Sequence, residues 1–127
     1  MNNIERLPES ELEVMLVLWH EKKQMTAGDI TKRLSETHGW KSGTVHVLLE
    51  RLRERGFVSC DKSGYKHLFT PSVTEQKYRK GEEQTMIHRF FGGSAKNMIA
   101  SLLNADGLSD DDIEEISALL KKKTGGK

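Results

Sequence analysis

Apolar residues recur at helical spacing in three segments of the first half of the chain. In residues 42–55 they stand at i, i+3, i+4 and i+7, which predicts an amphipathic helix with one buried stripe. Residues 9–20 and 26–35 also carry apolar residues at helical spacing, and polar stretches separate the three segments. The sequence therefore predicts three helices before residue 56. Their expected core positions are Leu12, Met15, Leu16, Trp19, Ile30, Leu34, Val45, Leu48, Leu49 and Leu52.

The ends of these segments carry residues that begin or end helices. Pro8 stands where a first helical turn can begin, and Thr26 with Asp29 three residues later resembles a capping box. Ser42 is the expected N-cap of the third helix. Gly56 is expected to end that helix in the left-handed conformation.

The period of the pattern changes after residue 56. Apolar residues in 57–60 precede a Lys-Ser-Gly turn, and a second apolar pair at 68–69 is closed by Pro71, which predicts a β-hairpin. Three helices followed by a hairpin is the order of a winged helix-turn-helix, whose third helix enters the DNA major groove while the wing lies along the backbone. We therefore expect a mainly α fold with a small β-hairpin wing, forming a DNA-binding domain at residues 1–72.

The outward surface of the third helix is small, hydroxylated and partly apolar, unlike a face that only meets water. Thr44, His46 and Val47 project from its first turns, where base edges are nearest, and are the candidate base-reading residues. Glu50 on the same surface counts slightly against DNA binding, although a glutamate can accept a hydrogen bond from the N4 amino group of cytosine. The candidate backbone contacts are Thr26, Lys41, Ser42, Arg51, Lys62, Tyr65 and Lys66.

Charge is balanced over the chain and uneven locally. The net charge of +1, from 20 Lys and Arg against 19 Asp and Glu, argues against a protein that coats nucleic acid indiscriminately. Residues 41–66 nonetheless carry six basic residues against three acidic ones. A local basic surface of this kind indicates selective, salt-sensitive DNA binding. A winged helix that binds proteins and has no DNA affinity is the alternative that this pattern leaves open.

Residues 73–127 predict three further helices. The first ends at Gly92-Gly93, the second stops near Gly107, and the third begins at Ser109 with an acidic first turn and a lysine-rich last turn. About 50 residues of this kind cannot easily bury their own apolar stripes, so we expect a helical dimerisation domain that pairs with a second copy. The alternative is a single three-helix cap folded onto the winged helix. The candidate dimer contacts are Phe90, Phe91, Met98, Leu102, Ile113, Ile116 and Leu120.

Composition removes several other classes of protein. A single cysteine, Cys60, excludes an intrachain disulfide framework and favours a reducing, cytoplasmic environment. We expect no secretory signal and no membrane insertion, because no run approaches the roughly 18 apolar residues of a span. The five histidines show no metal-ligand spacing with Cys60, and no nucleophile triad or phosphate loop is present. The expected cofactors and metals are none, and no enzymatic activity is expected.

Several longer motifs resemble the penicillinase and methicillin-resistance repressor family over residues 7–123. These are Glu13-Val14-Met15 with Trp19, Thr44-Val45 with Leu48, Arg51-Leu52 with Gly56, and Phe90-Phe91-Gly92-Gly93. The resemblance implies a homodimeric transcriptional repressor bound to palindromic operator DNA. It also implies a membrane-bound sensor metalloprotease system that triggers cleavage of the repressor in its second domain and so releases β-lactam-resistance genes.

Two departures from the family pattern bear on this expectation. The family's cleaved Asn-Phe bond aligns with Ser101-Leu102, the candidate cleavage bond here, and neither Asn97 nor Asn104 precedes an aromatic residue. Copper-responsive relatives carry a C-terminal Cys-x-Cys motif, which this chain lacks, so that branch is disfavoured. A small-molecule-sensing winged-helix regulator is the remaining alternative. It requires a ligand pocket between the dimer helices and the DNA domain.

Overall fold

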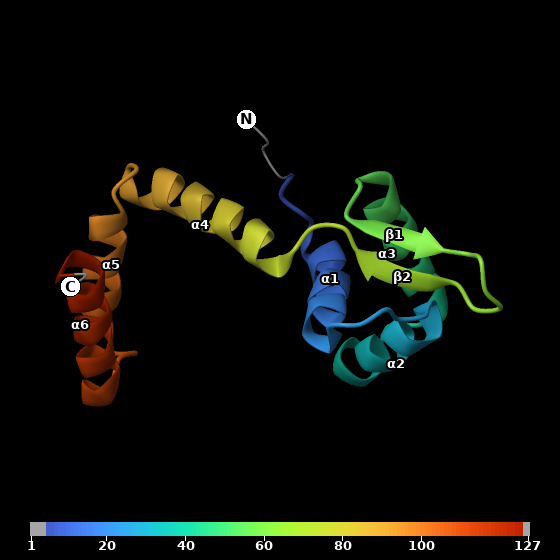
Figure 1. The fold of residues 1–127 in the computed structure, drawn as a ribbon, viewed down its shortest axis with the longest axis horizontal. Coiled ribbons are helices and arrows are strands. Elements are labelled where there is room, and N and C mark those ends of the chain that lie inside the picture. Colours follow the sequence, from blue (N-terminus) through green and yellow to red (C-terminus); the bar gives the residue numbers. More distant parts are fainter. Residues whose placement is uncertain (1–4, 126–127) are drawn as a thin grey trace. The chain divides into compact units, whose positions relative to one another are not determined.

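The computed structural model describes residues 5–125 and divides the chain into two compact units (Figure 1). The winged-helix unit ends at Glu82, and the C-terminal unit begins at Glu83. Six helices and one antiparallel hairpin make up the described residues, which confirms the predicted fold class. In chain order the elements are α1 (Glu9–Glu21), α2 (Ala27–His38), α3 (Ser42–Glu54), β1 (Val58–Asp61), β2 (Leu68–Pro71), α4 (Glu75–Phe91), α5 (Ala95–Leu103) and α6 (Asp110–Gly125).

The core of the winged-helix unit lies between α1, α2 and α3, with β1 packed on α3 and β2 on α1. The four predicted apolar positions of α3 and the two of α2 are all buried, as expected from their spacing. On α1 the buried set at i, i+3, i+4 and i+7 starts at Glu11 and continues through Val14, Met15 and Leu18. Leu12 and Leu16, which were predicted to be in the core, are only partly buried beside this set. The sequence did not indicate the correct register because the first buried position is occupied by a charged residue.

The predicted capping box at the start of α2 is confirmed. The Thr26 hydroxyl accepts from the Asp29 backbone N–H at 3.0 Å, and the Asp29 carboxylate accepts from the Thr26 N–H at 3.2 Å. The Thr26 backbone N–H that donates to the carboxylate, and next the Thr26 hydroxyl beside it, lower the pKa of Asp29. Gly39, at φ +70°, ends α2, so this helix runs past the end predicted near Ser35.

The ends of α3 differ slightly from expectation. Ser42 is the first helical residue and Lys41 occupies the N-cap position without a side-chain hydrogen bond, so the prediction of Ser42 as N-cap is wrong. Extended backbone at Lys41 (φ −101°, ψ 167°) sets the helix start in place of a capping side chain. Gly56 adopts φ +82° as predicted, one residue beyond the cap position at Arg55.

The hairpin gains a third segment that the sequence did not indicate. β1 and β2 pair in register from Val58 opposite Pro71 to Asp61 opposite Leu68. Met25 and Phe69 exchange both backbone hydrogen bonds, at 3.1 and 2.7 Å. Met25 is buried, so the stretch predicted as a polar break between α1 and α2 anchors the wing to the helices.

The first turns of α4 belong to the winged-helix unit, which extends past the boundary drawn after residue 72. The Tyr78 ring is buried, with its centroid 5.7 Å from that of Trp19 and 5.9 Å from that of Phe57. Its hydroxyl accepts from the Leu7 backbone N–H at 2.9 Å, and burial raises the pKa of Tyr78. The Trp19 indole N–H donates to the Val73 carbonyl at 2.8 Å. These contacts fix the connection between β2 and α4.

Replacement of Tyr78 by phenylalanine should destabilise the winged-helix unit by about 1–2 kcal/mol, because the buried Leu7 N–H then loses its acceptor. The free energy of unfolding in urea, followed by tryptophan fluorescence, measures this loss. Tyr65→Phe is the matched control, since the Tyr65 side chain is 99% exposed. Equal effects of the two substitutions would contradict the importance assigned to this hydrogen bond.

The C-terminal unit has exposed helices. The described helices α5 and α6 contain no buried residue in the single chain. Gly92 and Gly93, both at positive φ, separate α4 from α5 as predicted. Ser94 caps α5, and Ser109 and Asp112 form a reciprocal pair of hydrogen bonds at the start of α6. Within residues 5–125, no helix is both long and apolar enough to cross a membrane.

Candidate nucleic-acid interface

The surface of α3 opposite its buried stripe is the centre of the candidate interface. At 3.6 residues per turn, Gly43, Val47 and Glu50 lie opposite the stripe, with Thr44 and His46 on either side. All five are exposed, and the Val47 side chain keeps 51% of its surface in solvent. The candidate base-reading residues therefore lie around one outward face, with an apolar residue between the two polar ones.

His46 is held in one orientation by its own helix. Its ring Nδ1 lies 2.8 Å from the Ser42 carbonyl oxygen, one turn earlier. The contact ties the imidazole to the first turn of α3 and leaves Nε2 as the outer nitrogen. The sequence indicated the residue and did not indicate this contact.

Glu50, which counted against DNA binding, is neutralised by a neighbour. The Arg53 guanidinium engages both carboxylate oxygens of Glu50, with Nε donating to Oε1 at 3.2 Å. These hydrogen bonds lower the pKa of Glu50. The pair replaces an isolated negative charge on this face with a side-chain pair of no net charge.

The C-terminal end of α3 is fixed against α1 by a buried carboxylate. Arg55 Nε donates to Glu11 Oε1 at 2.7 Å, and the same guanidinium pairs with Glu5. The carboxylates of Glu5 and Glu11 raise the pKa of Arg55. Glu11 is only 1% exposed, so the pair sets the direction of α3 from within the core. Sequence reasoning missed Glu11, whose one signal was its place in the apolar spacing of α1.

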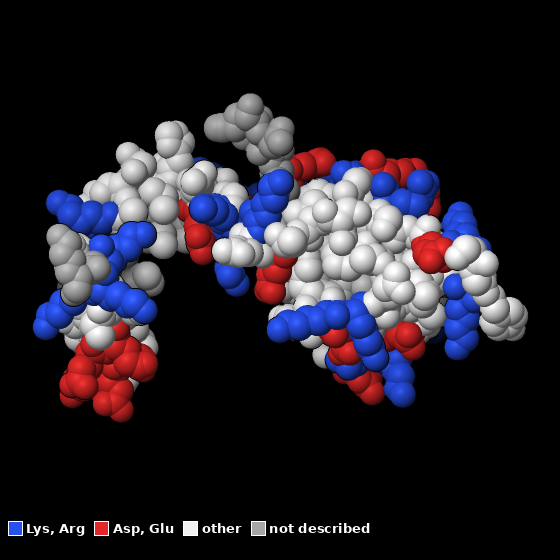
Figure 2. All heavy atoms as spheres, in the orientation of Figure 1, with Lys and Arg blue, Asp and Glu red and all other residues white. Residues whose placement is uncertain are grey.

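The wing brings together three of the candidate backbone contacts. Thr26 at the start of α2 and Tyr65 and Lys66 in the wing loop line one open hollow of about 570 Å³. The backbone N–H and the hydroxyl of Ser63 both donate to Asp61 Oδ1, at 2.9 and 2.6 Å, and shape the start of this loop. Figure 2 shows Lys and Arg side chains gathered next to the projecting tip of the wing.

Four basic residues of the α3 and wing surface remain available to a ligand. Of the six between residues 41 and 66, Arg53 and Arg55 are engaged by glutamates. The other four are exposed and take part in no ion pair among the residues that the structure describes. They are Lys41, Arg51, Lys62 and Lys66. These four cations were assigned to phosphate contacts from the sequence, and those contacts stay a prediction.

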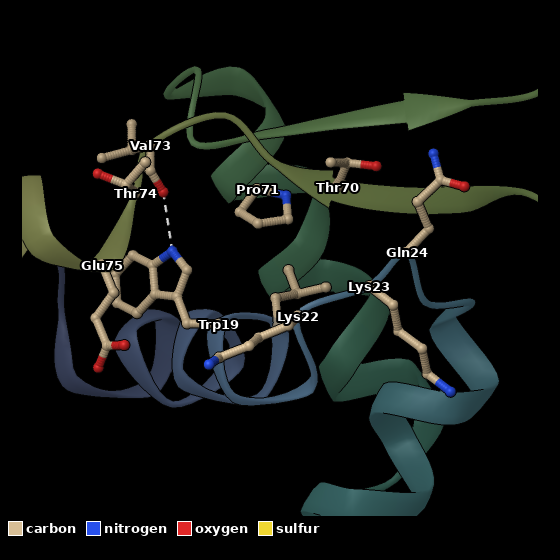
Figure 3. Close-up of a pocket in the computed structure, with 10 residues that line it drawn as sticks. Trp19, Lys22, Lys23, Gln24, Thr70, Pro71, Val73, Thr74 and Glu75 are labelled. Carbon is tan, nitrogen blue, oxygen red and sulfur yellow. Dashed lines mark hydrogen bonds between the residues drawn. The ribbon is translucent and has the colours of Figure 1, made fainter.

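A separate pocket of about 400 Å³ lies where α1 ends beside the connection from β2 to α4 (Figure 3). Trp19, Pro71 and Val73 form its apolar lining, and Lys22 and Glu75 are among its charged residues. Lys22 adopts the left-handed conformation at φ +57°, which is uncommon for a residue with a side chain. All the residues that line this pocket belong to the winged-helix unit, whereas the small-molecule-sensing alternative requires a pocket between the dimer helices and the DNA domain.

The candidate dimer contacts all lie on α4, α5 and α6, and each is exposed or partly exposed in the single chain. Phe90 is 70%, Leu102 54% and Leu120 50% exposed. Other exposed apolar residues on these helices, beyond the candidate dimer contacts, are Met86, Ile99, Leu103 and Leu119. The C-terminal unit therefore presents unburied apolar side chains along three helices.

The candidate cleavage bond Ser101-Leu102 lies within α5 and is exposed. Cys60 is a free, partly buried cysteine on β1. In the described part of the chain, no group of three or more His, Cys, Asp or Glu side chains is arranged to hold a metal ion.

Three packed helices followed by a hairpin, with an exposed third helix flanked by unpaired cations, define a winged-helix DNA-binding regulator. A family model described as penicillinase repressor matches residues 7–122. The chain belongs to the penicillinase repressor family. It is therefore a winged-helix transcriptional repressor and no enzyme, as the motifs predicted.

Relatives of known name agree over nearly the whole chain. The penicillinase repressor of Bacillus licheniformis is 30% identical over 122 residues, covering 96% of this chain and 94% of the relative. The methicillin resistance regulatory protein MecI of Staphylococcus aureus (strain N315) is 25% identical over 122 residues, covering 96% of this chain and 98% of the relative.

Solved structures resemble the winged-helix part. The DNA-binding domain of the repressor BlaI aligns with a TM-score of 0.52 at 32% identity, covering 61% of this chain and 94% of that domain. The Bacillus licheniformis BlaI monomeric form, solved in complex with the blaP half-operator, aligns with a TM-score of 0.53 at the same identity and coverage.

Proposed function

We propose that the chain represses transcription as a homodimer that binds a palindromic operator in the cytoplasm. α3 lies in the major groove of each half-site, and the wing follows the adjacent backbone. The observation that carries this proposal is the set of four exposed, unpaired cations around the outward face of α3. Lys41 is the N-cap residue of α3 and Arg51 lies on α3, whereas Lys62 and Lys66 lie on the wing, so phosphates on both sides of one groove have cationic partners.

The start of α2 supplies a further phosphate contact in this proposal. Thr26, at the N-terminus of α2, lines the same hollow as Lys66, and the Asp29 carboxylate in this hollow accepts a hydrogen bond from the Thr26 N–H. A phosphate there is stabilised by the helix N-terminus and by the lysine together. Ser42, in the first turn of α3, and Tyr65 on the wing provide neutral hydrogen-bond donors to the same backbone.

Dimerisation is assigned to the exposed apolar residues of the C-terminal unit. A two-fold operator with half-sites about one or two helical turns apart requires a two-fold protein. Burial of Phe90, Leu102 and Leu120 against a second copy removes from water the apolar surface that the single chain leaves exposed.

The regulated genes are assigned by similarity. Relatives named for penicillinase and methicillin resistance support β-lactam-resistance or related genes as targets. Release of the operator by proteolysis is part of the proposal, with Ser101-Leu102 as the bond and a membrane-bound sensor metalloprotease system as its trigger. This bond lies within α5, so cleavage requires local unwinding of a helix that has no buried residue to hold it.

Selection of genomic DNA tests the proposed function. The full chain is mixed with fragments of its own genome, and the retained fragments are sequenced. We expect one dominant motif with two-fold symmetry, located upstream of a gene. Fragments without a common motif would contradict sequence-specific repression.

A second function, small-molecule sensing, is favoured by the pocket beside Trp19. Its apolar lining and the Lys22 ammonium suit a small aromatic carboxylate, whose binding would act on the connection between β2 and α4. Titration of the Trp40→Phe variant with benzoate should then change Trp19 fluorescence and raise the melting temperature. No change in either signal would remove this second function.

A further inference from the structure

The hydrogen bond of His46 fixes which of its ring nitrogens carries the proton. Nδ1 lies 2.8 Å from the Ser42 carbonyl oxygen, and a carbonyl oxygen only accepts hydrogen bonds. Nδ1 must therefore donate. In the neutral imidazole the other nitrogen, Nε2, is then an acceptor with a free lone pair.

The groups around His46 leave this lone pair available to a ligand. The ring is exposed on the outward side of α3. Glu50, one turn further along, is the nearest acidic residue on the same side, and Arg53 engages both of its carboxylate oxygens. No side chain in the described residues is hydrogen-bonded to Nε2.

We propose that His46 selects, at one position of each half-site, a base that carries an exocyclic amino group in the major groove. Adenine offers N6–H and cytosine offers N4–H, and both donate to an acceptor. Guanine presents O6 and N7 and thymine presents O4, and all three atoms are acceptors. They cannot form a hydrogen bond with the Nε2 lone pair and are repelled by it. The inference rests on the proposed function, since it requires α3 to lie in the major groove.

Side-chain substitution at this position should reverse the preference. Lysine has donors and no acceptor, so His46→Lys should exchange adenine or cytosine for guanine or thymine at the same position. His46→Ala should lose the preference there and keep the rest of the motif. Lys62→Ala, which changes a wing cation, is the matched control and should keep adenine or cytosine.

The experiment is selection of binding sites from random duplexes by the full chain and by these three variants. A second measurement replaces the selected adenine by purine, or the selected cytosine by 2-pyrimidinone, each of which lacks the amino group. Wild-type affinity should fall by about 5- to 150-fold, the range expected when a base contact is lost, and the affinity of His46→Ala should not change.

Three outcomes overturn the inference. The first is guanine or thymine at every position that responds to His46 substitution. The second is a His46→Lys motif equal to that of the wild-type chain. The third is unchanged affinity of the wild-type chain for the duplex whose base lacks its amino group. In each case a two-fold motif is still recovered, so the proposed function stands. Recovery of no motif by the wild-type chain overturns both.

Discussion

A chain that ends at Glu82 should bind a two-half-site operator about 10²–10⁴-fold more weakly than the full chain. The truncated chain keeps the complete core of the winged-helix unit, including Tyr78 with its contacts to Trp19 and Phe57. It loses the exposed apolar helices to which we assign dimerisation. A linked pair of readers gains effective concentration for its second half-site, and a monomer does not.

Sedimentation and gel-shift measurements test this expectation together. The truncated chain should sediment as a monomer and should match the full chain on a duplex with one half-site. Phe90→Asp and Leu102→Asp in the full chain are the corresponding point variants, since both side chains are more than half exposed in the single chain and lie in the C-terminal unit. A truncated chain that still dimerises, or that binds the complete operator as tightly as the full chain, would place the dimer interface elsewhere.

Affinity for the operator should fall about 10³–10⁵-fold between about 50 and 200 mM salt. Four unpaired cations lie around each α3 and wing, so two copies present about eight charges to the phosphates, and each neutralised phosphate releases a counterion. Fluorescence anisotropy with a labelled operator gives the slope of log affinity against log salt.

Single lysines then test where the charge acts. Lys62→Ala should reduce the slope by about one for each phosphate that is no longer neutralised. Lys122→Ala, in the last turn of α6, is the matched control because it removes an exposed lysine from the C-terminal unit. A flat salt response of the wild-type chain, or equal slopes for both variants, would exclude the proposed phosphate contacts.

The architecture could be predicted from the sequence wherever one apolar stripe decides the structure. The stripe of α3 and the capping box at Thr26 are local patterns, and the structure contains both. Glu11 and Met25 were missed because their burial depends on partners far along the chain, Arg55 for one and Phe69 for the other. Tyr78 was assigned to the second domain for the same reason, since its partners precede it by many residues.

The candidate interface was predictable in its members and not in its pairings. The outward face of α3 follows from helical periodicity, which places Thr44 and Val47 in solvent once the stripe is known. Periodicity does not tell which charges are neutralised, and the pairing of Arg53 with Glu50 changes the charge expected on this face. The single chain leaves the C-terminal apolar residues exposed, so their pairing with a second copy stays a prediction.

The central claim is that α3 reads base sequence while the wing holds the backbone. The most direct test measures the affinity of Val47→Ala and Lys62→Ala for the selected operator and for a random duplex of equal length. Val47→Ala should lower the ratio of operator to random affinity, by about 1–3 kcal/mol for each base that the side chain no longer touches. Lys62→Ala should weaken binding to both duplexes alike and leave the ratio unchanged. The same ratio for both variants would contradict the assignment of α3 as the reader.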